Sequence, residues 1–345
     1  MWGFAVEQLT IRQIAQLANV SRSTVSRVIN NHPSVRPEVR QRVLEVIREQ
    51  DYVPQAAARS LASRRTNVVT LLIPRSSAII FTDPFFPLII QGITETCSER
   101  DYSVMLSMVT GTQERDFYQR VLRSRMTDGL LMLSSDIDDP VLPLLINDQM
   151  PLVLIGEHPY MQPMYTVDVA NRAGAVLAVS HLLQLGHRRI GAITGLLQMK
   201  TAIDRRDGYK QALLQAGVAI EHSLMIEGEF TQEGGYAAMR QLLSLEQRPS
   251  AVFVASDTMA LGALRAIYEA GLHAPHDISL IGFDDVPGAA YTTPALTTIH
   301  QPIQKLGSTA ATMLLDHLEG RPPLQQHFRL SPSLVLRQSC GPRVA

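Results

Sequence analysis

Residues 10 to 50 have the apolar spacing of three short helices. Apolar side chains recur there at intervals of three and four residues, which places them on one face of each helix. They are Ile11, Ile14, Ala15 and Ala18 in the first helix, Val25, Val28 and Ile29 in the second, and Val39, Val43, Leu44, Val46 and Ile47 in the third. The pattern therefore predicts a three-helix unit with its own small core.

Polar residues mark where these helices begin. Thr10 followed by Gln13 is a capping box, Ser21 caps the second helix, and Pro37 suits the first turn of the third. The turn between the first two helices falls at Asn19, and such an abrupt turn needs a positive φ, which Asn tolerates. Two short helices joined in this way are typical of a helix-turn-helix, a motif that reads DNA.

The second predicted helix carries groups that can contact base edges. Arg22, Ser23 and Arg27 lie at its start and along its outer face, and Arg can donate two hydrogen bonds to guanine. Taken alone, these side chains are better explained as a solvated surface, and the rest of the chain reverses that preference. Residues 1–66 hold ten Arg, no Lys and five acidic residues, a net charge of +5, so the remainder carries −6 of the total of −1. Attraction to phosphates predicts such a basic unit on an acidic body.

From Asn67 onward, short apolar strands alternate with amphipathic helices. Strands are predicted over residues 68–73, 103–108, 129–133, 152–155, 189–193, 251–254 and 278–281, and helices over 85–99, 116–125, 175–185, 208–216 and 260–270. Repeated βα units with buried strands imply parallel sheets covered by helices on both faces. Roughly 275 residues are too many for one simple core, so two lobes are expected, with a ligand cleft beyond the carboxyl ends of the strands.

Other features narrow the class of protein. Cys97 and Cys340 lie far apart, which favours free thiols in a reducing cytoplasm. No stretch approaches a membrane span, and the first six residues lack the basic start of a secretory signal. No zinc-binding Cys pair, phosphate loop, GxGxxG or GxSxG motif is present, and His273 and His276 are too isolated to ligate a metal. We therefore predict no enzyme activity, no metal and no cofactor.

Motifs in the helical unit point to a known family. They are Val20-Ser21-x-x-Thr24-Val25-Ser26-Arg27-Val28-Ile29-Asn30, and Tyr52-x-Pro54 followed by Ala58-Arg59-Ser60-Leu61. The sequence resembles the lactose repressor/galactose repressor (LacI/GalR) family over essentially the whole chain. The resemblance implies a hinge that folds into a helix on operator DNA, where Leu61 wedges into the minor groove. Gln55 departs from the family's usual Asn and is a poorer helix cap, so this hinge would depend even more on DNA. The implied DNA-binding residues are Thr10, Ser21, Arg22, Ser23, Thr24, Ser26, Arg27, Asn30, Arg59 and Leu61.

Motifs in the body resemble the same family, whose effector domain is similar to periplasmic sugar-binding proteins. They are Leu185-Gly186-His187, Arg205-x-x-Gly208-Tyr209, Ser256-Asp257-Thr258, Gly282-Phe283-Asp284-Asp285 and Leu296-Thr297-Thr298-Ile299-His300-Gln301-Pro302. The resemblance implies that Arg205 and Asp284 grip the effector, while Phe230 stacks on it. The other implied effector-binding residues are Asp83, Phe85 and Phe86 on the opposite wall, Gln301 at a crossover, and Thr201 and Ser256 at matching cleft positions.

A polyol suits this set of side chains. Arg and Asp can each bind two adjacent hydroxyls, and Phe covers the apolar face of a sugar ring. Alternatives stay open for single positions: residues 204–207 could form a local ion cluster, at least one of Phe85 and Phe86 could belong to the core, and Asp168 could be a structural cap at the end of its strand rather than a ligand contact. A purine is the main rival effector because of the three Phe side chains, whereas the Asp83 carboxylate favours a sugar.

The prediction is a cytoplasmic transcriptional regulator, expected to be a repressor, whose affinity for operator DNA is controlled by a small-molecule effector. A homodimer presents two headpieces to a pseudo-palindromic operator, and Leu334 and Leu336 are too few for a tetramerising zipper. A solute-binding protein without a DNA role is the less favoured alternative, because it would have a secretory signal and no headpiece.

The predicted fold is a small all-α helix-turn-helix headpiece followed by an α/β body of two lobes with parallel sheets, like a periplasmic binding protein. The headpiece spans residues 8–54, the hinge 55–66, and the effector-binding and dimerisation domain 67–340. Within that domain we expect one lobe of about 67–168 plus 303–329 and a second of about 169–300 plus 330–340.

Overall fold

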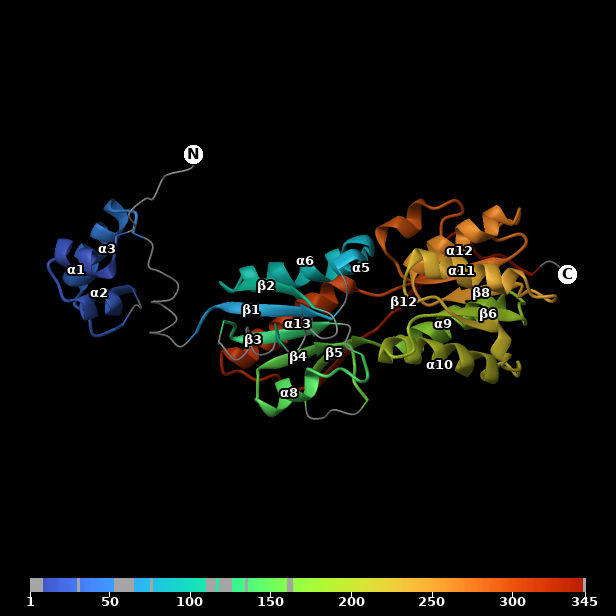
Figure 1. The fold of residues 1–345 in the computed structure, drawn as a ribbon, viewed down its shortest axis with the longest axis horizontal. Helices are drawn as coiled ribbons and strands as arrows, with labels where there is room; N and C mark the ends of the chain where they lie inside the picture. The colour runs from blue at the N-terminus through green and yellow to red at the C-terminus, as the bar shows by residue number, and fades with distance from the viewer. Residues whose placement is uncertain are drawn as a thin grey trace. The chain divides into compact units, whose positions relative to one another are not determined.

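The computed structural model describes residues 9–29, 32–52, 65–74, 77–109, 116–117, 126–133, 136–159 and 164–343. The chain divides at Asn67 into two compact units, a helical headpiece and an α/β body (Figure 1). Several predicted features lie outside the described residues: Asn30, Gln55, Arg59, Leu61 and most of the helix at 116–125. Among the described residues, no helix is both long and apolar enough to cross a bilayer.

Three helices form the headpiece: α1 (Ile11–Leu17), α2 (Arg22–Ile29) and α3 (Pro37–Glu49). Their buried side chains meet in one small core, made of Ile14, Ala15, Ala18, Val25, Val28, Val43 and Tyr52. Leu44, predicted as a core residue, is 42% exposed, so that prediction is wrong. One residue turns a helix by about 100°, which places Leu44 beside the face that carries Val43 rather than on it.

The helix starts agree with the predicted caps. Gln13 Oε1 accepts a hydrogen bond from Thr10 N at 2.7 Å, and Thr10 Oγ1 accepts one from Gln13 N at 3.4 Å, which completes the capping box. Ser21 Oγ accepts from Thr24 N at 3.1 Å and so caps α2. Asn19 has a φ of 49°, as the abrupt turn requires. The helix-turn-helix therefore forms as predicted.

The body contains two six-stranded sheets, one in each lobe. The first has the order β11-β5-β4-β3-β1-β2, with β1 Val68–Ile73, β2 Ser103–Met108, β3 Gly129–Leu133, β4 Leu152–Ile155, β5 Tyr165–Val169 and β11 His327–Leu330. The second has the order β12-β10-β9-β8-β6-β7, with β6 Ile190–Thr194, β7 Met225–Glu227, β8 Ala251–Val254, β9 Ser279–Asp284, β10 Thr297–His300 and β12 Ser333–Val335. Neighbouring strands are parallel, as predicted, except that β10 pairs with β12 in antiparallel register.

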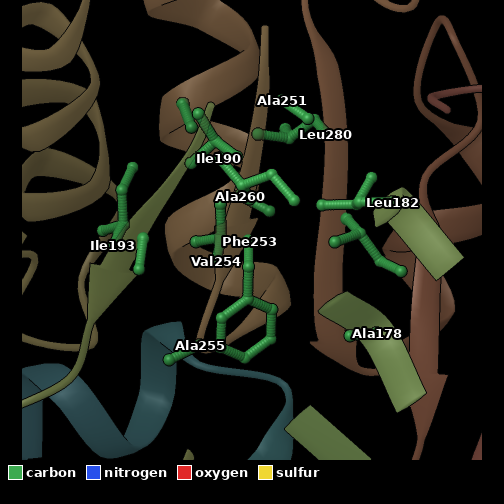
Figure 2. Packing of buried hydrophobic residues seen from close by; sticks show 14 of the residues in the cluster. Ala178, Leu182, Ile190, Ile193, Ala251, Phe253, Val254, Ala255, Ala260 and Leu280 are labelled. Carbon is green, nitrogen blue, oxygen red and sulfur yellow. The ribbon is translucent and has the colours of Figure 1, made fainter. Parts of the chain in front are cut away.

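Helices cover both faces of each sheet. Those of the first lobe are α5 (Ser77–Thr82), α6 (Phe85–Ser98), α8 (Leu142–Asn147) and α13 (Ile303–Leu318), and those of the second are α9 (Asn171–Gln184), α10 (Lys200–Gln215), α11 (Gln232–Leu243) and α12 (Asp257–Glu269), with short 3-10 turns at His222–Leu224 and Pro287–Tyr291. In Figure 1, α11 and α12 lie on one side of the second sheet and α9 and α10 on the other. Figure 2 shows part of the resulting core, in which Phe253 of β8 lies among side chains of α9, α12 and the neighbouring strands.

The chain passes between the two sheets three times. It leaves β5 for α9 at Ala170, leaves β10 for α13 at Gln301 and Pro302, and leaves β11 for β12 at residues 331–332. Each lobe is therefore assembled from separate stretches of sequence.

Several helices differ from their predicted bounds. Helix α10 begins at Lys200, eight residues before the predicted start, and α9 begins at Asn171, four residues early. The early turns of α10 are polar, so apolar periodicity cannot reveal them. Helix α13 is absent from the predicted set; it packs against α6 so closely that a Cβ on Gly307 would lie 2.4 Å from Ile89 O. Glycine permits this approach but weakens the helical signal.

Candidate functional site

A cavity lies between the two lobes, at the carboxyl ends of strands from both sheets. All nine predicted effector-binding residues line it: Asp83, Phe85, Phe86, Thr201, Arg205, Phe230, Ser256, Asp284 and Gln301. Apolar residues that sequence reasoning missed complete its walls: Ile79, Leu133, Ile155, Leu196, Met199 and Leu306. Leu133 ends β3 and Ile155 ends β4. Because ligands bind beyond the carboxyl ends of parallel strands, these positions could have been predicted from the sequence to line the cavity. The structure thus brings the predicted set together, while its binding of an effector stays a prediction.

Arg205 is held in a fixed orientation inside the cavity. Its side chain projects from α10 and the residue is 4% exposed. Nη1 donates to Ala255 O at 2.6 Å and to Asp284 Oδ1 at 3.1 Å, while Nε donates to Asn171 Oδ1 at 2.9 Å. The guanidinium also stacks 3.7 Å from the centroid of the Phe283 ring. Among the described residues, none accepts a hydrogen bond from Nη2, so Arg205 keeps two donors for a ligand.

Asp284 completes this buried ion pair. It ends β9 with a φ of 121°, a conformation that few residues other than glycine adopt. Its Oδ1 accepts from Gln301 Nε2 at 2.6 Å in addition to Arg205. Burial raises the pKa of Asp284 and lowers that of Arg205, because neither charged form is well solvated. The pair therefore depends on mutual attraction and hydrogen bonding to stay ionised.

The charged neighbours of Arg205 on α10 form ion pairs and do not line the cavity. Asp204 pairs with Lys200 and lies 3.6 Å from Arg172, while Arg206 Nη2 donates to Asp207 at 2.8 Å. These residues form the local ion cluster that the sequence left open as an alternative. Arg205 alone turns away from that cluster into the cavity, so each interpretation describes part of the segment.

Asp83 connects the two lobes. Its Oδ1 accepts from Phe85 N in its own lobe and from Thr258 Oγ1 of α12 in the second lobe, each at 3.0 Å. The rings of Phe85 and Phe86 meet edge to face with centroids 5.4 Å apart. Phe86 belongs to the core of the first lobe, whereas Phe85 is only partly buried. One of the two Phe residues is thus a core residue that also borders the cavity.

The ring of Phe230 packs against the backbone of Gly195. A Cβ on Gly195 would lie 2.0 Å from Phe230 Cζ, so the ring lies directly against Gly195. Both Phe230 and the preceding Glu229 have a φ of 59°. Ser256 Oγ accepts from Met259 N at 3.2 Å and so caps α12 as well as bordering the cavity.

Asp168 lines the cavity and also accepts structural hydrogen bonds where β5 leads into α9. Its Oδ1 accepts from Val169 N at 2.7 Å and from Asn171 Nδ2 at 3.0 Å. The N-cap position of α9 is Ala170, which provides no side-chain cap. Burial, with smaller contributions from neighbouring carboxylates, raises the pKa of Asp168 to about 7. Asp168 therefore has a structural role at the end of β5 and also borders the cavity, while its contact with a ligand stays a prediction.

The headpiece leaves its predicted DNA-reading residues accessible. Thr10, Ser21, Arg22, Ser23 and Arg27 are exposed, and Thr24 and Ser26 are partly exposed. Neither Arg22 nor Arg27 forms an ion pair with a described side chain, so both positive charges are available to DNA. Val25 and Val28 of the same helix are buried in the headpiece core, so α2 is held by these side chains while Arg22 and Arg27 stay exposed.

The folds of headpiece and body together define a DNA-binding transcriptional regulator. Residues 10–55 match the family of bacterial regulatory proteins called lacI, and residues 179–340 match the periplasmic binding protein-like domain. The transcriptional repressor PurR of Erwinia tasmaniensis is 37% identical over 333 residues, which cover 96% of each chain. The protein belongs to the lacI family.

Two solved structures show the same architecture. A complex of the transcriptional regulator CelR with cellobiose has a TM-score of 0.77 and 34% identity, and the similarity covers 96% of this chain and 99% of that one. The lac repressor dimer bound to operator and the anti-inducer ONPF has a TM-score of 0.84 and 28% identity, over 96% and 99% of the two chains. These similarities confirm the predicted fold class.

Proposed function

We propose that the protein is a cytoplasmic repressor that binds a pseudo-palindromic operator as a homodimer and releases or tightens it when a sugar occupies the interlobe cleft. The observation that carries this proposal is the buried Arg205–Asp284 pair. Three hydrogen bonds fix the guanidinium while leaving Nη2 open, an arrangement suited to gripping adjacent hydroxyls. The similarity to a CelR–cellobiose complex and to an operator-bound lac repressor dimer supports it.

The route from cleft to DNA runs through the relative arrangement of the lobes. The hydrogen bond between Thr258 and Asp83 joins them across the cavity. A ligand that contacts both lobes favours the arrangement in which both sets of contacts form. It changes operator affinity only by its differential affinity for the two arrangements, typically about 1–3 kcal/mol.

The test begins with the operator. Duplexes selected from a randomised pool by the full-length protein are expected to contain two inverted half-sites about one helical turn apart. Light scattering is expected to give the mass of a dimer. If the selection yields no common sequence, or only a single half-site, the proposed DNA-binding mode is wrong.

The second step asks whether the cleft controls the operator. Fluorescence anisotropy with the selected duplex is measured with and without cellobiose as a probe sugar. Phe230→Ala is expected to weaken the response without abolishing it, because stacking adds contact area but no hydroxyl geometry. Phe81→Ala is the matched control, since this side chain is 70% exposed and does not line the cavity. If Phe230→Ala and Phe81→Ala change the response to sugar equally, the proposed binding site in the cleft is wrong.

A purine is the second candidate effector. The aromatic side chains of Phe85, Phe86 and Phe230 at one cavity support it, because a planar base can stack on such rings. Adenine and guanine in the same anisotropy titration compare the two candidates directly.

A further inference from the structure

Three buried carboxylates face the cleft and use their oxygens in the same way. Asp83, Asp168 and Asp284 are 8%, 6% and 4% exposed. Each accepts two hydrogen bonds on Oδ1. No described residue donates a hydrogen bond to Oδ2 of any of the three, and none of these Oδ2 atoms is among the fully enclosed polar atoms without a partner. Each of these three residues that line the cleft therefore keeps one carboxylate oxygen, Oδ2, without a donor among the described residues.

The positive charge that faces these acceptors is small. Among the described residues that line the cavity, Arg205 is the one cation, and Asp284 already neutralises it. Glu229 adds a fourth carboxylate, on an exposed side chain at the cavity. Lys200, the next basic residue along α10, is paired with Asp204 and does not line the cavity. Above about pH 7, where Asp168 is ionised, acceptors and negative charge thus outnumber donors and positive charge.

We infer that the cleft takes an uncharged polyhydroxylated ligand and rejects its anionic relatives, such as sugar phosphates and aldonates. This inference rests on the proposed function, because it assigns the ligand to the same cleft. Hydroxyl groups can donate to all three Oδ2 atoms, and hydrogen bonds to carboxylates are about twice as strong as neutral ones. A phosphate or carboxylate on the ligand would add like charge in a poorly solvated site, where repulsion is weakly screened.

The raised pKa values of the three carboxyl groups are consistent with a shortage of hydrogen-bond donors to their ionised oxygens. Burial raises the pKa of Asp83, Asp168 and Asp284, because water that would donate to the ionised oxygens is largely excluded. Ligand hydroxyls replace those missing donors. An anionic ligand supplies fewer donors and more charge to the same oxygens.

The experiment compares uncharged probes with anionic partners of the same skeleton. Isothermal calorimetry with the full-length protein uses cellobiose against cellobionate, and ribose against ribose 5-phosphate. The uncharged member of a pair that binds is expected to bind at least tenfold more tightly. An anionic member that binds as tightly as its uncharged partner, or more tightly, overturns the inference.

Variants test whether the carboxylates cause the discrimination. Asp168→Asn is nearly isosteric. It is expected to weaken binding of the uncharged sugar and to narrow the ratio of the two dissociation constants within a pair. Glu229→Gln, on an exposed side chain, is expected to narrow the ratio without affecting folding. Asp139→Asn is the control, since Asp139 is a buried carboxylate that accepts from Val141 N and Leu142 N and does not line the cleft. An unchanged ratio in both cleft variants also overturns the inference.

Binding of the same preparations to the selected operator separates this inference from the proposed function. If the protein binds operator and responds best to an anionic sugar, the inference fails and the proposed function stands. If the protein selects no operator but prefers the uncharged sugars, the proposed function fails and the inference stands.

Discussion

The headpiece and the body treat arginine in opposite ways. Arg22 and Arg27 of the headpiece are exposed and make no ion pair with a described residue, whereas Arg205 of the body is 4% exposed and donates three hydrogen bonds. A charge that attracts DNA phosphates works from solvent, where it displaces counterions and depends on salt. A charge that selects a small ligand works through orientation in a poorly solvated site. The same residue type is therefore placed for long-range attraction in the headpiece and for a fixed orientation in the body.

Removing Arg205 is expected to have the largest effect on the body. Arg205→Ala is expected to lower the free energy of unfolding of the body by roughly 3–5 kcal/mol, because the partner carboxylate stays buried without a cation. The response of operator binding to sugar is expected to disappear. Chemical denaturation and operator titration measure the two effects. Arg265→Ala, which removes a solvent-exposed pair with Glu269, is the control and should change stability little; equal losses would show that burial is not the cause.

A pH titration tests Asp168, another buried carboxylate of the body. Because the pKa of Asp168 is raised from its ordinary value to about 7, the folded protein holds this proton between about pH 4 and pH 7 while the unfolded chain releases it. Stability is therefore lost as pH rises through this window, by at most ~1.4 kcal/mol per pH unit. Asp168→Asn removes the titration, so the wild-type protein should lose stability relative to the variant up to pH 7 and not above. A difference that stays constant with pH would mean that Arg205 keeps Asp168 ionised.

Replacing Arg22 tests the role of an exposed arginine of the headpiece. If its guanidinium reads guanine, Arg22→Ala is expected to cost roughly 1–3 kcal/mol at one half-site position and to relax base preference there. Anisotropy on operators substituted at each position measures this. Equal weakening on every sequence, with a smaller dependence on salt, would instead assign Arg22 to a phosphate.

The smallest expected effect concerns the cap of α2. Ser21→Ala removes the oxygen that accepts from Thr24 N and is expected to destabilise the headpiece by about 1 kcal/mol. Amide hydrogen exchange in α2 measures it locally. Ser23→Ala is the matched control, because Ser23 Oγ contacts the Ser21 hydroxyl and caps no helix. If the amides of α2 are protected equally in both variants, the Ser21 cap does not contribute to the stability of the headpiece.

Local patterns predicted most of the fold. The strands of the body are continuous apolar runs, and β1, β2, β3, β4 and β8 form at the predicted residues. Capping residues and Asn19 also predicted the headpiece turn. Where one face of an element does not bury apolar side chains, the pattern is lost: the polar start of α10 turns toward the cavity and the ion cluster, so its periodicity is hidden.

The candidate site was likewise predicted only in part from the sequence. The resemblance placed nine residues that do gather at one cavity. It could not show that Oδ1 of Asp83 binds Thr258, because these residues are 175 positions apart and no local rule links them. The residues 204–207 by themselves could not show which of the four enters the cavity; the resemblance named Arg205, and the packing of α10 against Phe283 and Asn171 gives the physical reason.

The three crossings between the sheets also bear on the order in which the protein matures on the ribosome. The helices of the headpiece come from one contiguous stretch, Ile11 to Glu49, so all of their contacts are available early in synthesis. The first lobe lacks α13 and β11 until residue 330 has emerged, and the second lacks β12 until residue 335. A nascent chain therefore has a complete headpiece long before it has a complete body, and premature termination before residue 335 would leave the headpiece attached to an unfinished body.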